Sequence, residues 1–443
     1  MNATRTTLRR LACLLAFAAM LPAASAREVT CRIEVDRTLL PANTTANAVI
    51  KVTLEAPDAP TAAARTPVNL CIVLDRSGSM SGAKIEHARL AAIEAVRRLH
   101  PDDIFSLVTY DSSIETVIPA RHPRDLEWIE DQIRRIQPRG MTALFGGVSQ
   151  GAAEIRKHLD GRFIHRIILL SDGIANVGPG TPEDLGRLGD SLLKENIHVS
   201  TIGVGLDYNE DLMTRLALRA GGNTYFVEDS ADLPRILASE LGEAQRVVAQ
   251  RVILELLLPE GIRPVRVIGR EGRLEHRRVE VPLHQLHGGQ SRFALVEVQV
   301  PPQSPEATLE LARARITYDD IATERQIRTS EQAVSVQFSA RSEDVEASAN
   351  LQVNLDLLEN RRAEAQAEAI RLNDEGRRQE AATLMRGVAE DFDRVGNALH
   401  APAAVQAGRE LSVQAEVLEE RGLDSRQRKV FRAESYQTIM QQK

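Results

Sequence analysis

Residues 68–80, Val-Asn-Leu-Cys-Ile-Val-Leu-Asp-Arg-Ser-Gly-Ser-Met, join an apolar run of strand length to a cluster of side-chain oxygens. Such a continuous apolar run is typical of a strand that is buried on both faces of a sheet. Asp75, Ser77 and Ser79 follow the run at alternate positions, and Gly78 is expected to let the backbone turn there. The sequence therefore predicts a central strand that delivers one carboxylate and two hydroxyls at its carboxyl end.

An alternation of strands and helices extends from this run through residues 66–245. A helical segment at 82–99 follows the first strand, and apolar runs recur at 104–110, 166–171 and 198–204. Alternating strand and helix units imply an α/β fold with a doubly wound, mostly parallel sheet that is covered on both faces. Residues 113–118 follow their neighbour after a very short turn, which predicts an antiparallel edge strand.

The segments on either side have the pattern of antiparallel β-structure. Between 246 and 340, short strands with a period of two are separated by Pro and Gly, which is typical of a β-sandwich. Two strands are predicted within residues 27–62, at 29–35 and 48–54, and they have no partner nearby in the sequence. We therefore expect them to complete the sandwich, with the α/β domain inserted within it.

The two ends of the chain differ in composition from the rest. Residues 1–26 combine an Arg-rich start, an apolar stretch from Leu11 to Leu21 and the small residues Ala24-Ser25-Ala26, which is the pattern of a signal peptide. Residues 343–443 are rich in Ala, Glu, Arg and Leu, which predicts a helical C-terminal domain. We expect an exported protein, periplasmic or secreted, that has no transmembrane segment.

The charge of the chain limits its classes of partner, and its cysteines raise the question of a disulfide. Lys and Arg number 55 against 62 Asp and Glu, so the formal net charge is −7. No nucleic acid is expected as a partner, because affinity for it depends on clustered positive charge that neutralises phosphates. Export permits a disulfide between Cys31 and Cys71, but the apolar run around Cys71 favours a free, buried thiol.

Two further segments add oxygen ligands to the first three. Asp172 directly follows the apolar run at 166–171, and Thr142 precedes a predicted helix. In open α/β sheets, ligands bind at the carboxyl ends of the strands, where the strand order reverses. Two carboxylates and three hydroxyls form a hard, all-oxygen set that suits Mg²⁺, Mn²⁺ or Ca²⁺ and lacks the soft ligands that favour zinc. The predicted metal ligands are Asp75, Ser77, Ser79, Thr142 and Asp172.

This set resembles the metal-ion-dependent adhesion site of von Willebrand factor A (VWA) domains. The five ligands match that site residue by residue, and the resemblance covers residues 66–245. The flanks resemble a bacterial branch of the family named after calcium-activated chloride channels and inter-alpha-trypsin-inhibitor heavy chains. The chain departs from the family pattern at Met141, where Gly is usual, and at Ala143, where a polar residue is common.

The resemblance implies a binding protein rather than an enzyme. In this family the metal ion captures an Asp or Glu side chain of a protein ligand, and the last helix of the domain moves when the site is occupied. Here that helix, near 230–244, runs almost directly into a predicted strand at 250–258. We therefore expect Mg²⁺-dependent adhesion or recognition, with the short junction passing the movement of the helix to the sandwich.

Other functions fit parts of the sequence. The helical tail could serve as a periplasmic assembly scaffold, with the metal only stabilising the fold. Asp75 lies where aspartate-based phosphatases place their first carboxylate, but Ser77 replaces the second, which would act as acid and base. Residues 147–151 match the nucleophile elbow of hydrolases, but a Gly-rich loop precedes them where the elbow needs a buried strand. His284 and His287 are interpreted as part of a surface turn.

Overall fold

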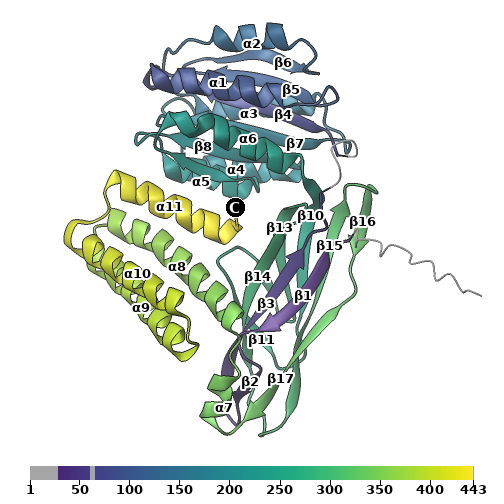
Figure 1. The fold of residues 1–443 in the computed structure, drawn as a ribbon, viewed down its shortest axis with the longest axis vertical. Coiled ribbons are helices and arrows are strands. Elements are labelled where there is room, and N and C mark those ends of the chain that lie inside the picture. Colours follow the sequence, from purple (N-terminus) through teal and green to yellow (C-terminus); the bar gives the residue numbers. More distant parts are fainter. Residues whose placement is uncertain (1–27, 60–64, 443) are drawn as a thin grey trace, which may run out of the picture.

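The computed structural model describes residues 28–59 and 65–442, and the predicted signal at 1–26 lies outside them. Figure 1 shows an α/β domain above a β-sandwich, with a group of helices beside the sandwich and below the α/β domain. The strand order confirms the predicted fold class, because the α/β sheet is inserted between two strands of the sandwich. No helix within the described ranges combines the length and the apolarity needed to cross a membrane.

The α/β domain contains a six-stranded sheet in the order β6-β5-β4-β7-β8-β9. Its strands are β4 (Val68–Asp75), β5 (Ile104–Tyr110), β6 (Ile114–Arg121), β7 (Ile164–Ser171), β8 (Ile197–Val204) and β9 (Thr224–Val227). Neighbouring strands are parallel except for β6, which pairs antiparallel with β5 at the edge, as predicted. The central position of β4 explains why its sequence is apolar at nearly every residue.

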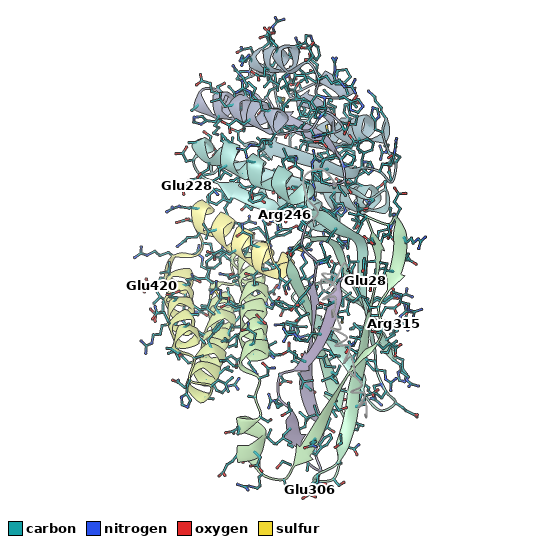
Figure 2. The ribbon with its side chains drawn as sticks, turned by 45° about the vertical axis from the view of Figure 1, so that its right-hand side comes forward. Glu28, Glu228, Arg246, Glu306, Arg315 and Glu420 are labelled. Atoms are coloured by element: carbon teal, nitrogen blue, oxygen red, sulfur yellow. The ribbon has the colours of Figure 1, made fainter. Side chains whose placement is uncertain are left out.

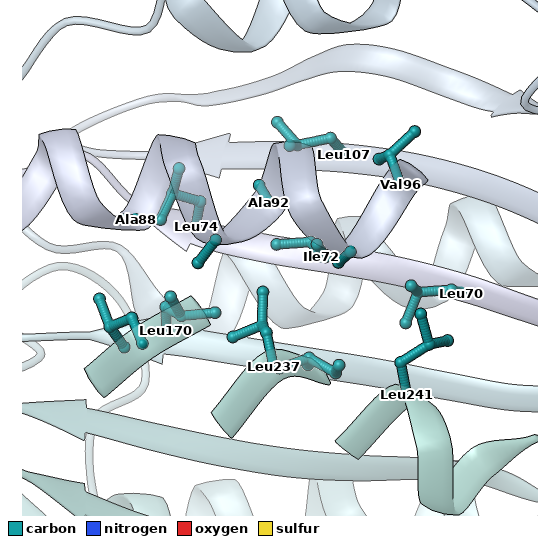
Figure 3. Packing of buried hydrophobic residues seen from close by; sticks show 14 of the residues in the cluster. Leu70, Ile72, Leu74, Ala88, Ala92, Val96, Leu107, Leu170, Leu237 and Leu241 are labelled. Atoms are coloured by element: carbon teal, nitrogen blue, oxygen red, sulfur yellow. The ribbon is translucent and has the colours of Figure 1, made fainter. Parts of the chain in front are cut away.

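Helices cover both faces of this sheet. They are α1 (Ala83–Arg97), α2 (Leu126–Arg134), α3 (Leu144–Arg156), α4 (Pro182–Lys194), α5 (Glu210–Arg219) and α6 (Leu233–Ala244). Successive side chains of a strand point to opposite faces. Leu70, Ile72 and Leu74 of β4 therefore pack with α1 and α6, as Figure 3 shows. Cys71 and Val73 pack on the other face, where Cys71 is a free, buried thiol as predicted.

Two β-sheets form the sandwich, in the orders β1-β3-β14-β11 and β12-β13-β10-β15-β17-β2, with β16 paired to β15. The strands are β1 (Thr30–Val35), β2 (Leu39–Pro41), β3 (Ala46–Glu55), β10 (Val247–Leu257), β11 (Arg263–Ile268), β12 (Arg273–Glu275), β13 (Arg278–His287), β14 (Ser291–Val300), β15 (Thr308–Asp320), β16 (Arg325–Arg328) and β17 (Gln332–Ser339). The predicted pairing of the N-terminal strands with the sandwich is confirmed, because β3 lies between β1 and β14.

One prediction about the sandwich is wrong. His284 and His287 lie in strand β13 and not in a surface turn. His284 is half-buried and His287 is buried. The two glycines that follow His287 do form the turn, but the strand continues up to them.

The C-terminal helices form their own core and also dock on both other domains. They are α7 (Ser342–Ala347), α8 (Leu351–Asp374), α9 (Arg378–Ala398), α10 (Pro402–Arg421) and α11 (Ser425–Met440). Val353 of α8 packs with Ile268 on one sheet of the sandwich. Tyr436 of α11 packs with Ala217 of α5, so α11 lies directly below the α/β domain in Figure 1. The predicted bundle is therefore attached to the rest of the molecule.

Candidate metal site

The predicted ligands lie at the carboxyl edge of the α/β sheet, where β4 and β7 are neighbours. From β4 the chain continues to β5 on one side and later to β7 on the other, so the strand order reverses at this point. Leu74 pairs with Leu170, which brings Asp75 beside Ser171, and Asp172 follows directly. Open α/β sheets bind ligands in the crevice at such a reversal.

A series of hydrogen bonds connects four of the predicted ligands. The Ser77 and Ser79 hydroxyl oxygens are 3.0 Å apart, and the Ser79 hydroxyl donates to Asp172 Oδ1 at 2.7 Å. The backbone N–H of Ser77 donates to Asp75 Oδ1 at 2.8 Å. Side chains from two separate strand ends thus form one continuous polar group.

Thr142, the fifth predicted ligand, approaches this group from the loop before α3. A Cβ atom placed on Gly173 would lie 3.0 Å from Thr142 Oγ1 and 3.6 Å from Ser79 Oγ. Both hydroxyls therefore border the same small space, which a side chain at position 173 would fill. Asn176 fixes the loop, because its Oδ1 accepts the backbone N–H of Thr142 at 2.9 Å.

Asp75 is fully buried and makes no ion pair with any described residue within 4.0 Å. Its Oδ2 accepts a hydrogen bond from the Ser171 hydroxyl at 2.6 Å. Burial raises the pKa of Asp75 to about 6, although the hydrogen bonds from Ser171 and Ser77 act in the opposite direction. A buried carboxylate needs compensating positive charge to stay ionised, so this position favours a bound cation.

Lys84, in the first turn of α1, is a charged neighbour that the motif does not reveal. Its ammonium group pairs with Asp172 Oδ2 at 2.5 Å, while Ser79 occupies Oδ1. Asp172 therefore already has a positive partner, whereas Asp75 has none among the described residues. The sequence shows a Lys shortly after the motif, but only the fold shows that its side chain turns back to the sheet edge.

Asp111, which directly follows β5, connects the loops that surround the predicted ligands. Its Oδ2 accepts hydrogen bonds from Arg76 Nε at 2.7 Å and from Arg139 Nε at 2.9 Å. Burial acts to raise the pKa of Asp111, but hydrogen bonds from Arg139, Ser113 and Arg76 outweigh it and hold that pKa below its usual range. The loop after β4 and the loop before α3 are thus fixed to the same carboxylate.

The backbone turns at Gly78 as expected, but the turn does not require glycine. Gly78 begins a short 3-10 turn at Gly78–Met80, and a Cβ atom there would meet only Gly140 O, at an ordinary 3.7 Å. Gly140 is the position that requires glycine. Its φ is +70°, and a Cβ atom there would lie 2.9 Å from Ser112 Oγ.

The donor set fits a hard divalent cation. Among the described residues, no group of three or more His, Cys, Asp or Glu side chains could hold a metal ion. A cation at this edge would therefore depend on the hydroxyls as well as on the two carboxylates. Hydroxyl and carboxylate oxygens are ligands that Mg²⁺, Mn²⁺ and Ca²⁺ accept.

Comparison with known proteins agrees with this architecture. The family model for the von Willebrand factor type A domain matches residues 69–239. This chain contains a VWA domain. An uncharacterized protein of Synechocystis sp. is 29% identical over 273 residues, which cover 58% of this chain and 63% of that protein. Inter-alpha-trypsin inhibitor heavy chain H3 of Mesocricetus auratus is 27% identical over 177 residues, which cover 38% of this chain and 20% of that protein.

The matches to these curated relatives span less than two thirds of their length. A solved structure, a von Willebrand factor type A protein from Catenulispora acidiphila, has a TM-score of 0.66 at 17% identity and covers 89% of this chain and 97% of that chain. Because this match extends well beyond the VWA domain, the two proteins share the fold of the flanking parts too. VWA domains commonly mediate protein interactions and are generally recognition domains rather than enzymes.

Proposed function

We propose that this chain is an exported recognition protein whose VWA domain uses a divalent cation, chiefly Mg²⁺, to capture an Asp or Glu side chain of a protein partner. The observation that supports this most is the convergence of the ligands: hydrogen bonds connect Asp75, Ser77, Ser79 and Asp172, and Thr142 borders the same space. Export rests on the signal pattern of residues 1–26.

The charges of the site suit an acidic ligand. Asp75 and Asp172 would provide two negative charges, and the three hydroxyls would provide neutral oxygens. Because Lys84 adds a positive charge beside Asp172, the site with a divalent cation would be positive overall. When bound, the cation supplies an electrophilic centre that accepts a carboxylate oxygen. Mn²⁺ or Ca²⁺ would suit the same oxygens.

Calorimetric titration with Mg²⁺ and with Mn²⁺ tests the proposal. Asp75→Asn keeps the shape of the side chain but removes its charge, and we expect it to weaken binding roughly thirtyfold or more. The reason is that charges of +2 and −1 about 4 Å apart attract by about 2 kcal/mol even in bulk water. Asp102→Asn, at an exposed acidic residue just before β5 and so at the opposite edge of the sheet, is the matched control and should bind like wild type. Equal affinity in wild type and Asp75→Asn would refute the assignment.

A further inference from the structure

The sheet edge that carries the candidate metal site also exposes large apolar side chains. Ile174 is 60% exposed, the highest value among the large hydrophobic residues of the described ranges, and Met141 and Leu206 are 51% and 42% exposed. Ile174 and Leu206 follow the carboxyl ends of β7 and β8, and Met141 lies in the loop between α2 and α3 that contacts this edge. Exposed apolar residues that gather in one place mark interaction surfaces, whereas isolated ones are common everywhere.

Met141 and Ile174 lie on either side of Thr142. Met141 precedes it in the chain, and the backbone N–H of Met141 donates to Ser112 Oγ at 2.9 Å. The segment with Ile174 folds back over Thr142, because the N–H groups of Asn176 and Val177 donate to Thr142 O at 3.2 and 3.3 Å. Both apolar side chains are therefore held next to a predicted metal ligand by backbone hydrogen bonds.

Leu206 reaches the same edge from the end of β8. It follows Gly205, and a Cβ atom on Gly205 would lie 3.5 Å from Lys84 Nζ. Lys84 in turn pairs with Oδ2 of Asp172, whereas Ser79 contacts Oδ1. Leu206 therefore lies on the Lys84 side of the site, and apolar surface borders the ligands on more than one side.

Two uncharged stretches border Thr142, although Arg139, which is 61% exposed, directly precedes the first of them. Residues 140–146 are Gly-Met-Thr-Ala-Leu-Phe-Gly, and residues 173–180 are Gly-Ile-Ala-Asn-Val-Gly-Pro-Gly. A partner that covers only these two stretches would desolvate no charge there, and its own apolar side chains would gain from leaving water. Uncharged and partly apolar residues thus border the site at these two stretches.

We infer that the partner presents its Asp or Glu in an exposed loop whose neighbouring residues are apolar, and that Met141, Ile174 and Leu206 form the surface that selects those neighbours. This inference rests on the proposed function and specifies its partner class. The carboxylate complements the positive site, and the flanking aliphatic or aromatic side chains cover the three exposed residues. A uniformly acidic segment would match the cation but would leave this surface in contact with charged groups.

Selection from a displayed peptide library tests the inference. The full chain is immobilised with Mg²⁺, the library carries a fixed central Glu with randomised neighbours, and bound peptides are eluted with EDTA and sequenced. We expect Leu, Ile, Val, Met and Phe to be enriched about tenfold at the neighbouring positions, because burying one such side chain favours binding by about that factor. The variant Met141→Ser/Ile174→Ser/Leu206→Ser should lose this enrichment and keep the Mn²⁺ affinity of wild type.

A matched control replaces three exposed apolar residues far from the site, in the variant Val265→Ser/Leu274→Ser/Val413→Ser, and it should select the same peptides as wild type. EDTA-eluted peptides with polar or uniformly acidic neighbours would overturn the inference and leave the proposed function standing. The inference would also be overturned, with the proposed function left standing, if the variant Met141→Ser/Ile174→Ser/Leu206→Ser still selected apolar neighbours. If EDTA elutes no peptide from wild type, the proposed function fails and the inference fails with it.

Discussion

At the scale of single residues, the two carboxylates of the site differ in their surroundings. Asp172 pairs with Lys84 at 2.5 Å, while Asp75 is held only by hydroxyl and backbone donors. The ammonium group of Lys84 would therefore lie close to any cation that contacts Asp172. Lys84 stabilises the charge of Asp172 without a metal, but it also repels a metal that enters.

We predict that Lys84→Met strengthens Mg²⁺ binding. Charges of +1 and +2 about 5 Å apart repel by about 1.7 kcal/mol even in bulk water, so the affinity should rise more than tenfold. Lys157→Met removes a comparable lysine that pairs with Glu154 at 2.7 Å, and it should leave the affinity unchanged. Calorimetric titration of both variants measures the effect. Weaker binding by Lys84→Met would show that the lysine supports the cation instead.

At the scale of elements, α6 connects the VWA domain to the sandwich. It ends at Ala244, and β10 begins at Val247 after only Gln245 and Arg246. Leu237 and Leu241 of α6 pack on the same face of the sheet as α1, which carries Lys84 (Figure 3). Arg246, labelled in Figure 2, fixes the junction to the turn after β13, because its Nη2 donates to Gly288 O at 2.6 Å.

A shift of α1 on ligand binding would therefore press on α6 and, through Arg246, on the sandwich. We predict that Mg²⁺ with excess acetate, whose carboxylate stands in for that of the partner, changes amide hydrogen exchange in residues 231–260. Residues 378–398, which form α9 on the far side of the helical domain, should exchange as before and serve as the internal control. Exchange that is unchanged in both segments would argue against transmission through this helix.

Element length decided how well the strands could be predicted. The long apolar runs of β4, β5, β7 and β8 gave clear signals, because each strand is buried on both faces. The strands β2, β9, β12, β16 and β17 were not predicted individually. The first four contain only three or four residues, which is too little periodicity to distinguish a strand from a loop. Four of the five predicted ligands could be placed at one sheet edge because they follow the long strands β4 and β7, whereas Thr142 lies in the loop before α3.

At the scale of the whole molecule, buried and half-buried histidines lie where the VWA domain meets the sandwich. A Cβ atom on Gly221 would lie 3.0 Å from the His284 ring and 3.1 Å from His198 Nδ1, so the two rings lie near each other. Burial lowers the pKa of His284 to about 4, and burial likewise lowers the pKa of His198 and of His287 well below the usual value. Positive charge on nearby arginines, Arg292 among them, acts in the same direction.

These shifts predict that stability falls in acid. In the unfolded chain these histidines bind protons below about pH 6.5, whereas in the folded chain they resist protonation. Stability is therefore complete above about pH 6.5 and is lost as the pH falls toward the folded pKa values. Each histidine lowers the free energy of unfolding by about 1.4 kcal/mol per pH unit in that range.

Thermal unfolding measured between about pH 7 and pH 5 checks this expectation. The midpoint should fall as the pH falls. In His198→Gln the midpoint should depend less steeply on pH, because one of the histidines that resist protonation is absent. His400→Gln, at an exposed position in the helical domain, should not change the slope. A midpoint that is constant over this range would contradict the prediction, because it would show that these histidines bind protons equally well in the folded and the unfolded chain.

The docking of the C-terminal helices could not be predicted from the sequence. Lys429 of α11 pairs with Glu210 of α5 at 2.6 Å, and residues so far apart in the chain give no local signal. Because α8 and α11 face the other domains, the alternative function as an assembly scaffold would have to use the outer helices α9 and α10. The insertion of the VWA domain was predictable, since the N-terminal strands lacked partners of their own.

The central claim is that five side chains from separate segments bind a single divalent cation. The most direct measurement is anomalous diffraction from crystals of the full chain soaked in Mn²⁺. We predict one manganese peak enclosed by Asp75, Ser77, Ser79, Thr142 and Asp172, and no such peak in Asp75→Asn. A wild-type map without density at this edge of the sheet, or with manganese bound only elsewhere, would contradict the account.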